Sequence, residues 1–234
     1  MKPSTVRKTF ILAFFLCIAW FSPRLCAQEI DYWNEDEANK TYVSYLNETE
    51  NQVLVELNKV RTNPARYAQE YITPLLTRFT NEDPNIRVTD DGRNLMTDEG
   101  PKAVKECITE LKKAKAVPPL KPSKGMSKAA KDHIRDQGPS GRIGHQGFDN
   151  SDPFKRMNRY GTWQTIAGEN ISYGENTARE IVIQLLIDDG VANRGHRKII
   201  MEVQCLVVGI AVGTHKSYNW MCTMDLAGGY EEKE

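Results

Sequence analysis

Four histidines are the residues of this sequence best suited to acid–base or metal chemistry, because a neutral imidazole is both a base near neutral pH and a metal ligand. They are His133, His145, His196 and His215. His145 and His196 each follow a glycine, which lets the backbone approach another segment and leaves the ring accessible. His133 falls on an apolar helical face, where we expect a packed side chain, and His215 falls in an expected turn, where we expect contact with solvent. His145 and His196 are therefore the candidates for a site.

A carboxylate flanked by glycines is the next candidate group. Glu169 lies in the stretch 167–174, which taken by itself indicates a turn. The motifs that define HExxH zinc peptidases, GxSxG hydrolases, class A β-lactamases, P-loop NTPases and dinucleotide-binding proteins are absent from the sequence. The chain therefore belongs to none of these motif-defined classes.

The composition is that of an ordinary globular protein. The sequence has 31 Lys and Arg against 31 Asp and Glu, and 40% of its residues are hydrophobic. This balance argues against a basic nucleic-acid-binding protein and against an acidic disordered chain. Nucleic acid is therefore not an expected partner.

The first 27 residues are expected to be a signal peptide. They combine a basic start, an apolar run over 10–21 and a small residue before Gln28. The apolar run is shorter than the ~20 residues that a membrane-spanning helix needs. Cleavage after Ala27 removes four basic residues and leaves 27 basic against 31 acidic side chains, a net charge of −4. We expect a secreted or periplasmic protein with no transmembrane segment after cleavage.

The remaining chain is predicted to start with an acidic flexible leader over 28–48, followed by one folded domain over 49–230. Helices are predicted to begin at a capping box at Thr49, at Asn63-Pro64, at Pro101, near Lys124 and behind a second capping box at Thr177. The polar segment 77–100 is expected to be a long surface loop. The domain is therefore mainly helical in its first half.

The end of the domain changes character. Residues 205–212 are apolar and β-rich, and 218–226 alternate with the period of a strand, which predicts an antiparallel hairpin turning near 215–217. Helices first and strands late indicate the α+β class, most simply a sheet covered by helices on both faces. A disulfide between Cys205 and Cys222 is one possibility, although this hairpin leaves them out of direct register; Cys107 is expected in the core.

Several motifs in a fixed order resemble the CAP superfamily, which comprises cysteine-rich secretory proteins, antigen 5 and plant pathogenesis-related proteins. The motifs are Asn58-x-x-Arg61, Gly144–Asp149, Gly168–Ile171, a helix ending in Asp188–Gly190, Arg194–Arg197 and Val208–Val212. The likeness covers about 51–229 and is strongest to the secreted bacterial, SCP-like branch. It implies a three-layer α-β-α sandwich with a central antiparallel sheet.

The resemblance also implies a cleft of two histidines and two acidic residues that binds a divalent metal. Carried over by motif, His145 and His196 would be the metal ligands and Glu169 one acid. The family has Glu on the helix where this chain has Asp188, with Asp189 as the fallback. The shorter side chain reaches about one methylene less far, so Asp188 is expected to orient a histidine. Two imidazoles would suit Zn²⁺, and an adjacent carboxylate could take a proton from a bound water.

Three functions are compatible with these residues. The first is a secreted CAP-domain protein that binds an extracellular ligand, such as a lipid, a sterol or a cell-wall fragment. The second is a metal-dependent hydrolase or peptidase that uses Glu169 as general base. The third is a structural interaction module in which the four residues are vestigial. Family membership does not choose among them, since one fold hosts many functions.

Overall fold

The computed structural model describes residues 30–89 and 91–233. The expected signal peptide, 1–27, lies outside these residues. All elements below belong to the unit Asp31–Glu234. No helix in the described ranges is long and apolar enough to cross a membrane.

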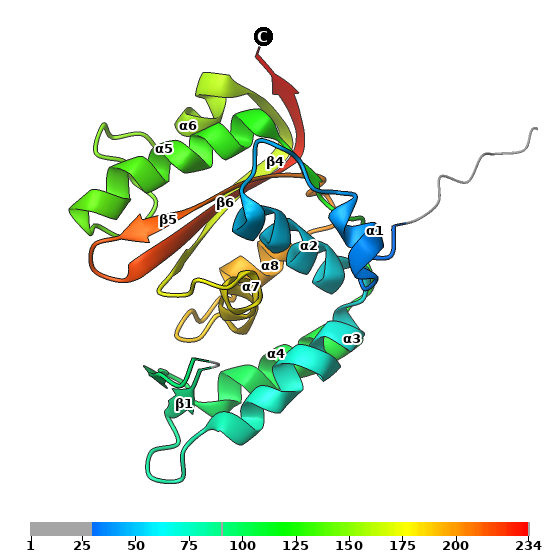
Figure 1. Ribbon diagram of the computed structural model, residues 1–234, viewed down its shortest axis with the longest axis vertical. Coiled ribbons are helices and arrows are strands. Elements are labelled where there is room, and N and C mark those ends of the chain that lie inside the picture. The colour runs from blue at the N-terminus through cyan, green and yellow to red at the C-terminus, as the bar shows by residue number, and fades with distance from the viewer. Residues whose placement is uncertain (1–29, 90, 234) are drawn as a thin grey trace, which may run out of the picture. The chain divides into compact units, whose positions relative to one another are not determined.

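A four-stranded sheet is the centre of this unit (Figure 1). Its strands are β3 (Lys121–Pro122), β4 (Gly161–Tyr173), β5 (Val207–His215) and β6 (Asn219–Glu232), in the order β3-β5-β6-β4. Strands β4, β6 and β5 pair antiparallel, and the short β3 lies parallel to β5. The hairpin predicted near 215–217 is confirmed as β5 and β6, and Val212, not Cys205, lies opposite Cys222.

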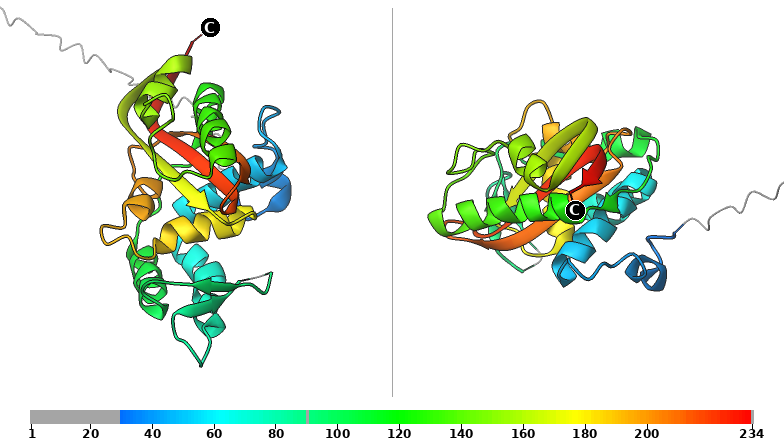
Figure 2. Two further views of the ribbon diagram at one scale, coloured as in Figure 1. Left: turned by 90° about the vertical axis from the view of Figure 1, so that its left-hand side faces the viewer. Right: turned by 90° about the horizontal axis from the view of Figure 1, so that it is seen from above.

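Helices cover both faces of the sheet, which confirms the three-layer α-β-α sandwich. Helices α5 (Lys124–Ser140) and α6 (Pro153–Tyr160) pack on one face, and α2 (Glu48–Thr62) and α7 (Ala178–Ile187) pack on the other. Helix α8 (Gly195–Ile200) follows α7, and Figure 2 shows α5 lying along the strands of the hairpin. Helix α5 can approach β5 this closely because Gly209 has no side chain. A Cβ at this position would lie 2.1 Å from a backbone carbon of Met126.

The two faces carry separate cores. The larger core gathers the apolar sides of α2, α4, α7 and the β5 and β6 residues that face them, such as Leu57, Leu186 and Met224. The smaller one lies under α5 and α6 and is built around Met126 and Met157. All three cysteines of the described chain are free and buried, so no disulfide joins Cys205 to Cys222.

Predicted helix starts agree with the structure at four places. Asn63 caps α3 (Pro64–Tyr67), which continues as the π-helix η1 (Ala68–Ile72) and the 3-10 helix η2 (Thr73–Arg78). Helix α4 (Pro101–Lys113) opens on its proline, α5 opens at Lys124, and the side chain of Thr177 caps α7. Helix α2 begins two residues earlier than predicted, because its capping box is formed by Asn47 and Glu50 and does not start at Thr49.

Two segments expected to be irregular contain structure. The expected leader holds helix α1 (Glu35–Asn39) and packs on the domain, because Tyr32 and Leu46 are buried and the Trp33 ring stacks on Tyr71 at 5.6 Å. The expected loop 77–100 holds strands β1 (Ile86–Val88) and β2 (Asn94–Met96), which form a two-stranded antiparallel hairpin. Both segments are too short to show a period in the sequence.

Candidate functional site

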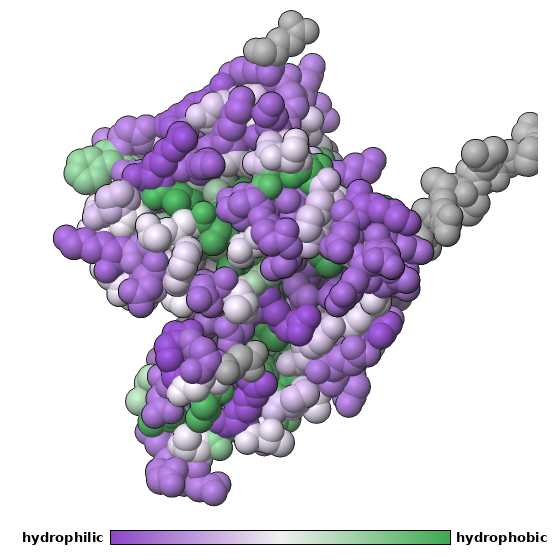
Figure 3. Space-filling view, in the orientation of Figure 1, coloured by the Kyte–Doolittle hydropathy of each residue, from purple (hydrophilic) through white to green (hydrophobic). Residues whose placement is uncertain are grey.

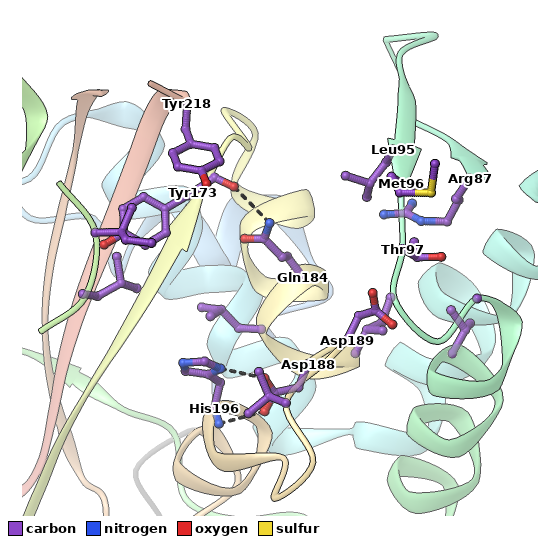
Figure 4. A pocket seen from close by; sticks show the side chains of 17 residues that line it. Arg87, Leu95, Met96, Thr97, Tyr173, Gln184, Asp188, Asp189, His196 and Tyr218 are labelled. Atoms are coloured by element: carbon purple, nitrogen blue, oxygen red, sulfur yellow. Dashed lines mark hydrogen bonds and ion pairs between the residues drawn. The ribbon is translucent and has the colours of Figure 1, made fainter. Parts of the chain in front are cut away.

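His196 and Asp188 form the first pair of candidate residues (Figure 4). Helix α7 ends at Ile187, and Asp188 follows it in the left-handed conformation with φ 56°. Its Oδ2 accepts the backbone N–H of His196 at 2.9 Å, and its Oδ1 bonds the Nδ1 of the same residue at 2.6 Å. Because a carboxylate only accepts, the ring proton lies on Nδ1 and Nε2 is the nitrogen left for a ligand. Asp188 thus orients the histidine, as the sequence predicts.

Asp189, the fallback acid, has a different partner. Its carboxylate accepts the backbone N–H groups of Asp98 and Glu99 at 2.6 and 3.0 Å. These two residues join the β1–β2 hairpin to helix α4. Asp189 therefore anchors the hairpin and does not contact either candidate histidine.

Two buried arginines hold the turn between α7 and α8. Arg194 makes paired contacts with Glu99 and Glu106 and also donates to the carbonyl of Asp188 at 2.7 Å. Arg197 is buried, donates to the Leu186 carbonyl at 2.6 Å and pairs with Glu106 and Glu110 of α4. The carbonyls at the end of α7 are thereby satisfied, which fixes the position of Asp188.

His145 and Glu169 form the second pair. Glu169 was expected in a turn but lies in strand β4, with its side chain 1% exposed. Its Oε1 bonds His145 Nδ1 at 2.8 Å, and its Oε2 accepts from Nη2 of the buried Arg156 at 2.7 Å. Arg156 also donates to the His145 carbonyl at 3.0 Å. The His145 ring is half-exposed, so its carboxylate partner is fixed while its outer edge meets solvent.

Opposing effects act on the ionisation of Glu169. Burial favours its neutral form, but the hydrogen bond from His145 and the positive charge of Arg156 outweigh burial and lower its pKa below the usual value. Glu169 is therefore an ionised carboxylate whose two oxygens are already engaged. This describes an orienting group better than a general base.

Strand β4 links the two pairs. Glu169, Ile171 and Tyr173 alternate along one face of the strand, and the Tyr173 hydroxyl accepts the N–H of Gly144 at 3.0 Å. The intervening Asn170 donates to the carbonyl of His196 at 3.1 Å. One strand therefore positions both the loop that carries His145 and the helix that carries His196.

A cavity of about 320 Å³ opens beside the His196 pair. Its walls come from β4, α7, the start of α4, the loop before His145 and the β1–β2 hairpin (Figure 4). The side chains that line it are mainly apolar: Leu95, Met96, Val104, Ile143, Ile171, Leu185, Ile187 and Val191, with Tyr173 and Tyr218. His196 and Asp188 supply a polar end, whereas His145 and Glu169 are not among the residues that line this cavity.

The exposed surface gives the cavity a distinct rim. Met96, Ile143 and Tyr218 are 65%, 61% and 46% exposed, and all three line the cavity. On the face drawn in Figure 3, by contrast, hydrophobic residues form small separate groups among hydrophilic ones. Large apolar side chains exposed around a hollow are typical of a ligand or partner site.

The donors present do not fit a zinc site with three protein ligands. Within residues 30–89 and 91–233, no group of three or more His, Cys, Asp and Glu side chains is arranged to hold a metal ion. The carboxylates of Glu169 and Asp188 bond the imidazoles, so His145 and His196 are the only candidate ligands left among the four expected residues. Catalytic zinc sites use three protein ligands.

The other two histidines are structural. His133 is fully buried, as expected, and its Nε2 bonds the Gly144 carbonyl at 2.9 Å. His215 was expected in solvent but is 2% exposed. Its Nδ1 accepts the N–H groups of Ser217 and Tyr218, which places the proton on Nε2 for the Arg142 carbonyl at 2.8 Å. His215 therefore closes the β5–β6 turn.

The Asn58-x-x-Arg61 motif supports the site from behind. Asn58 bonds both the N–H and the carbonyl of Leu120, and Arg61 donates to the carbonyls of Pro118, Ile200 and Cys205. Because Ile200 is the last residue of α8, the buried Arg61 fixes the helix that carries His196. The sequence named this motif only as part of the family resemblance and did not indicate that it supports α8.

Sequence reasoning also missed Arg156 and Asp225, which lie behind His145. Asp225 is opposite Glu169 in the β4–β6 pairing and is fully buried. Residues 221–227 of β6 are buried on both faces in the structure, whereas the alternation read from the sequence indicated burial on one face only.

One family model and two solved structures are similar to this chain. Residues 54–224 match the family model of the cysteine-rich secretory protein family, CAP. An outer surface protein of Borrelia burgdorferi aligns over 50% of this chain and 80% of its own, with 15% identity and a TM-score of 0.41. An extracellular protein with an SCP domain from Bacillus anthracis aligns over 47% of this chain and 34% of its own, with 19% identity and a TM-score of 0.37.

A search of curated protein sequences gave no match. The family match covers well over half of the chain, from within α2 to within β6. It contains both histidine–carboxylate pairs and the strand that joins them. The chain therefore belongs to the cysteine-rich secretory protein (CAP) family.

Proposed function

We propose that this chain is an exported binding protein whose cavity beside His196 holds an extracellular ligand with an apolar body, lipid-like or derived from the cell wall. The observation that carries the proposal is the 320 Å³ cavity with mainly apolar walls and a histidine–carboxylate pair at one end. Export is supported by the signal peptide that the sequence predicts over the first 27 residues.

The energetic argument comes from the exposed rim. Apolar surface removed from water contributes roughly 25 cal/mol per Å². Met96, Ile143 and Tyr218 hold such surface in contact with water in the free protein. A ligand that covers them gains this contribution, while His196 Nε2 offers one polar contact that fixes its orientation.

Two charge substitutions in one loop test the proposal. Ile143→Glu places a charge on the cavity wall, and Phe148→Glu is the matched control, because Phe148 is 70% exposed but does not line the cavity. Binding of decanoate, cholesterol sulfate and a disaccharide-peptide fragment of peptidoglycan is measured by calorimetry. We expect at least one probe to bind, with affinity reduced tenfold or more by Ile143→Glu and unchanged by Phe148→Glu. Binding of none, or equal losses in both variants, contradicts the proposal.

One observation favours a second candidate, a metal-dependent hydrolase. Both imidazoles bond a carboxylate through Nδ1, which is how histidines that ligate metals are commonly oriented. This candidate is second because both oxygens of Glu169 already accept hydrogen bonds and because the described part of the chain offers no third ligand. Its roles for Glu169 and Asp188 as catalytic acids, and for His145 and His196 as ligands of Zn²⁺ or another divalent metal, stay proposals.

Metal analysis separates the two candidates. For a hydrolase, zinc should copurify with the wild type and be lost from the His145→Ala/His196→Ala double variant. Glu169→Gln should then abolish cleavage of the peptidoglycan fragment while zinc stays bound. Cleavage that survives removal of both histidines contradicts the hydrolase, whereas ligand binding without zinc or cleavage supports the binding protein.

A further inference from the structure

Asp225 is a buried acid directly behind the His145 pair. It lies in the middle of strand β6, where it is paired with Glu169 of β4 on one side and Gly209 of β5 on the other. Its side chain is fully buried. Side chains directly opposite each other on neighbouring strands share a face of the sheet. The two carboxyl groups are accordingly direct cross-strand neighbours on one face of the sheet.

The donors around these two acids are distributed unequally. Glu169 accepts N–H groups from His145 and Arg156, one on each oxygen. Among the described residues, no N–H or O–H group donates to either oxygen of Asp225. A hydrogen bond between two carboxyl groups needs one proton between them. Since both oxygens of Glu169 already accept, the proton belongs on Asp225.

Charge balance leads to the same assignment. Two ionised carboxylates directly opposite each other in a sheet would repel, and only one cation, Arg156, contacts them among the described residues. His133, which packs on this face from α5, stays neutral because burial lowers its pKa. With Asp225 neutral, Arg156 and Glu169 cancel and the buried group carries no net charge.

The electrostatics of the two acids agree with this distribution. Burial raises the pKa of Asp225 well above its usual value, and the negative charge of Glu169 raises it further. The pKa of Glu169 is lowered, because the hydrogen bond from His145 and the charge of Arg156 outweigh burial. These two directions are those expected for a pair in which Asp225, and not Glu169, holds the proton.

We propose that Asp225 is a positioning residue for His145: its carboxylic acid donates a hydrogen bond to Glu169 and holds that carboxylate where it accepts from His145 Nδ1. The chain of contacts runs from Asp225 through Glu169 to His145 and does not include the cavity. The inference therefore holds whether or not the cavity binds the probes named above.

The test compares two substitutions of one residue. Asp225→Asn keeps a polar donor toward Glu169, whereas Asp225→Leu has similar size and no donor. Nitrogen-15 chemical shifts report which nitrogen of each histidine carries the proton. We expect the Nδ1–H form of His145 in the wild type and in Asp225→Asn, and its loss to a mixture of forms in Asp225→Leu. His196, oriented by Asp188, is the internal control and should keep its Nδ1–H form in all three proteins.

Two further measurements keep the result decisive. Thr223→Val changes a buried residue on the same face of β6 and should leave the His145 signals unchanged. In the wild type, the carbon-13 shift of the Asp225 carboxyl group should be that of a protonated acid at pH 7, which needs no variant to fold. An ionised Asp225 at pH 7, or His145 signals unaffected by Asp225→Leu, overturns the proposal.

Discussion

The hydroxyl of Tyr173 accepts the backbone N–H of Gly144 at 3.0 Å, which ties the residue before His145 to strand β4. The same hydroxyl donates to Gln137 at 2.8 Å, and Gln137 in turn donates to the Gly144 carbonyl at 2.6 Å. Both backbone groups of Gly144 are thus engaged from two directions. The loop that carries His145 is fixed by side chains on either side of it.

Tyr173→Phe should loosen this loop. The substitution removes the acceptor of the Gly144 N–H, and an unpaired part-buried amide costs about 1 to 3 kcal/mol. Amide hydrogen exchange should be faster at Gly144 and at His145. Tyr218→Phe is the control, because Tyr218 belongs to the same group of rings and its hydroxyl makes no hydrogen bond within the described residues. Unchanged exchange at Gly144 in Tyr173→Phe would argue against this role.

Arg61→Gln should destabilise the fold strongly. The fully buried guanidinium donates to several backbone carbonyls, which would lose a charged donor. Loss of a buried charged partner costs about 3 to 5 kcal/mol. Arg135→Gln is the control, since its side chain is 71% exposed and its pairing with Asp132 spans 3.9 Å, so an effect below about 1 kcal/mol is expected. The free energy of unfolding in urea measures both, and similar losses would contradict the prediction.

The loss of unfolding free energy at acidic pH should depend on Arg194. Hydrogen bonds from Arg194 lower the pKa of Glu99 to about 2, from a usual value of 4.5. A folded-state pKa below the unfolded value gives stability that is present above pH 4.5 and is lost as the pH falls toward 2. Arg194→Gln should therefore flatten the fall of unfolding free energy in this window. Curves that stay parallel for the two proteins below pH 4.5 would contradict the assignment.

Asp225→Asn should gain stability over the wild type as the pH rises. The pKa of Asp225 is raised in the folded protein by burial and by Glu169, so the unfolded chain releases this proton more easily. The wild type therefore loses stability as the pH rises above the usual value of 3.8, and the amide does not. The unfolding free energy of Asp225→Asn relative to that of the wild type should therefore be higher at pH 7 than at pH 3.5. A difference between the two proteins that is constant with pH would show that Asp225 is not held neutral.

Helix starts with distinct chemical signals could be predicted from the sequence. Proline at the first helical position marks α3 and α4, and the capping side chain of Thr177 marks α7. Strand β4 could not be predicted, because its residues show no clean alternation. It contains a bulge between Gln164 and Ala167, and Thr165 has φ 69°. The strand exists because β6 pairs with it, and that pairing is a tertiary property.

In the site, too, residues in local motifs could be predicted and contacts that depend on tertiary pairing could not. His145, Glu169, His196 and Asp188 could be named from ordered motifs, and the expectation that Asp188 orients a histidine agrees with its contacts. The contact of Glu169 with Asp225 could not be named, because it depends on strand register. His215 was misjudged for a related reason, since a turn residue is buried here by contacts with the distant Arg142 loop.

The β1–β2 hairpin forms one wall of the cavity apart from the elements that hold the two histidine–carboxylate pairs. Arg87, Leu95, Met96 and Thr97 come from this short insert and form one wall of the cavity, whereas the opposite wall is made by the central strands and helices. Its attachment at Asp189 uses the backbone N–H groups of Asp98 and Glu99, which every residue except proline retains. Under the proposed function, mutation within the hairpin changes which compounds bind while the histidine pairs stay intact, so homologues that differ there should diverge in ligand selectivity before they diverge in stability.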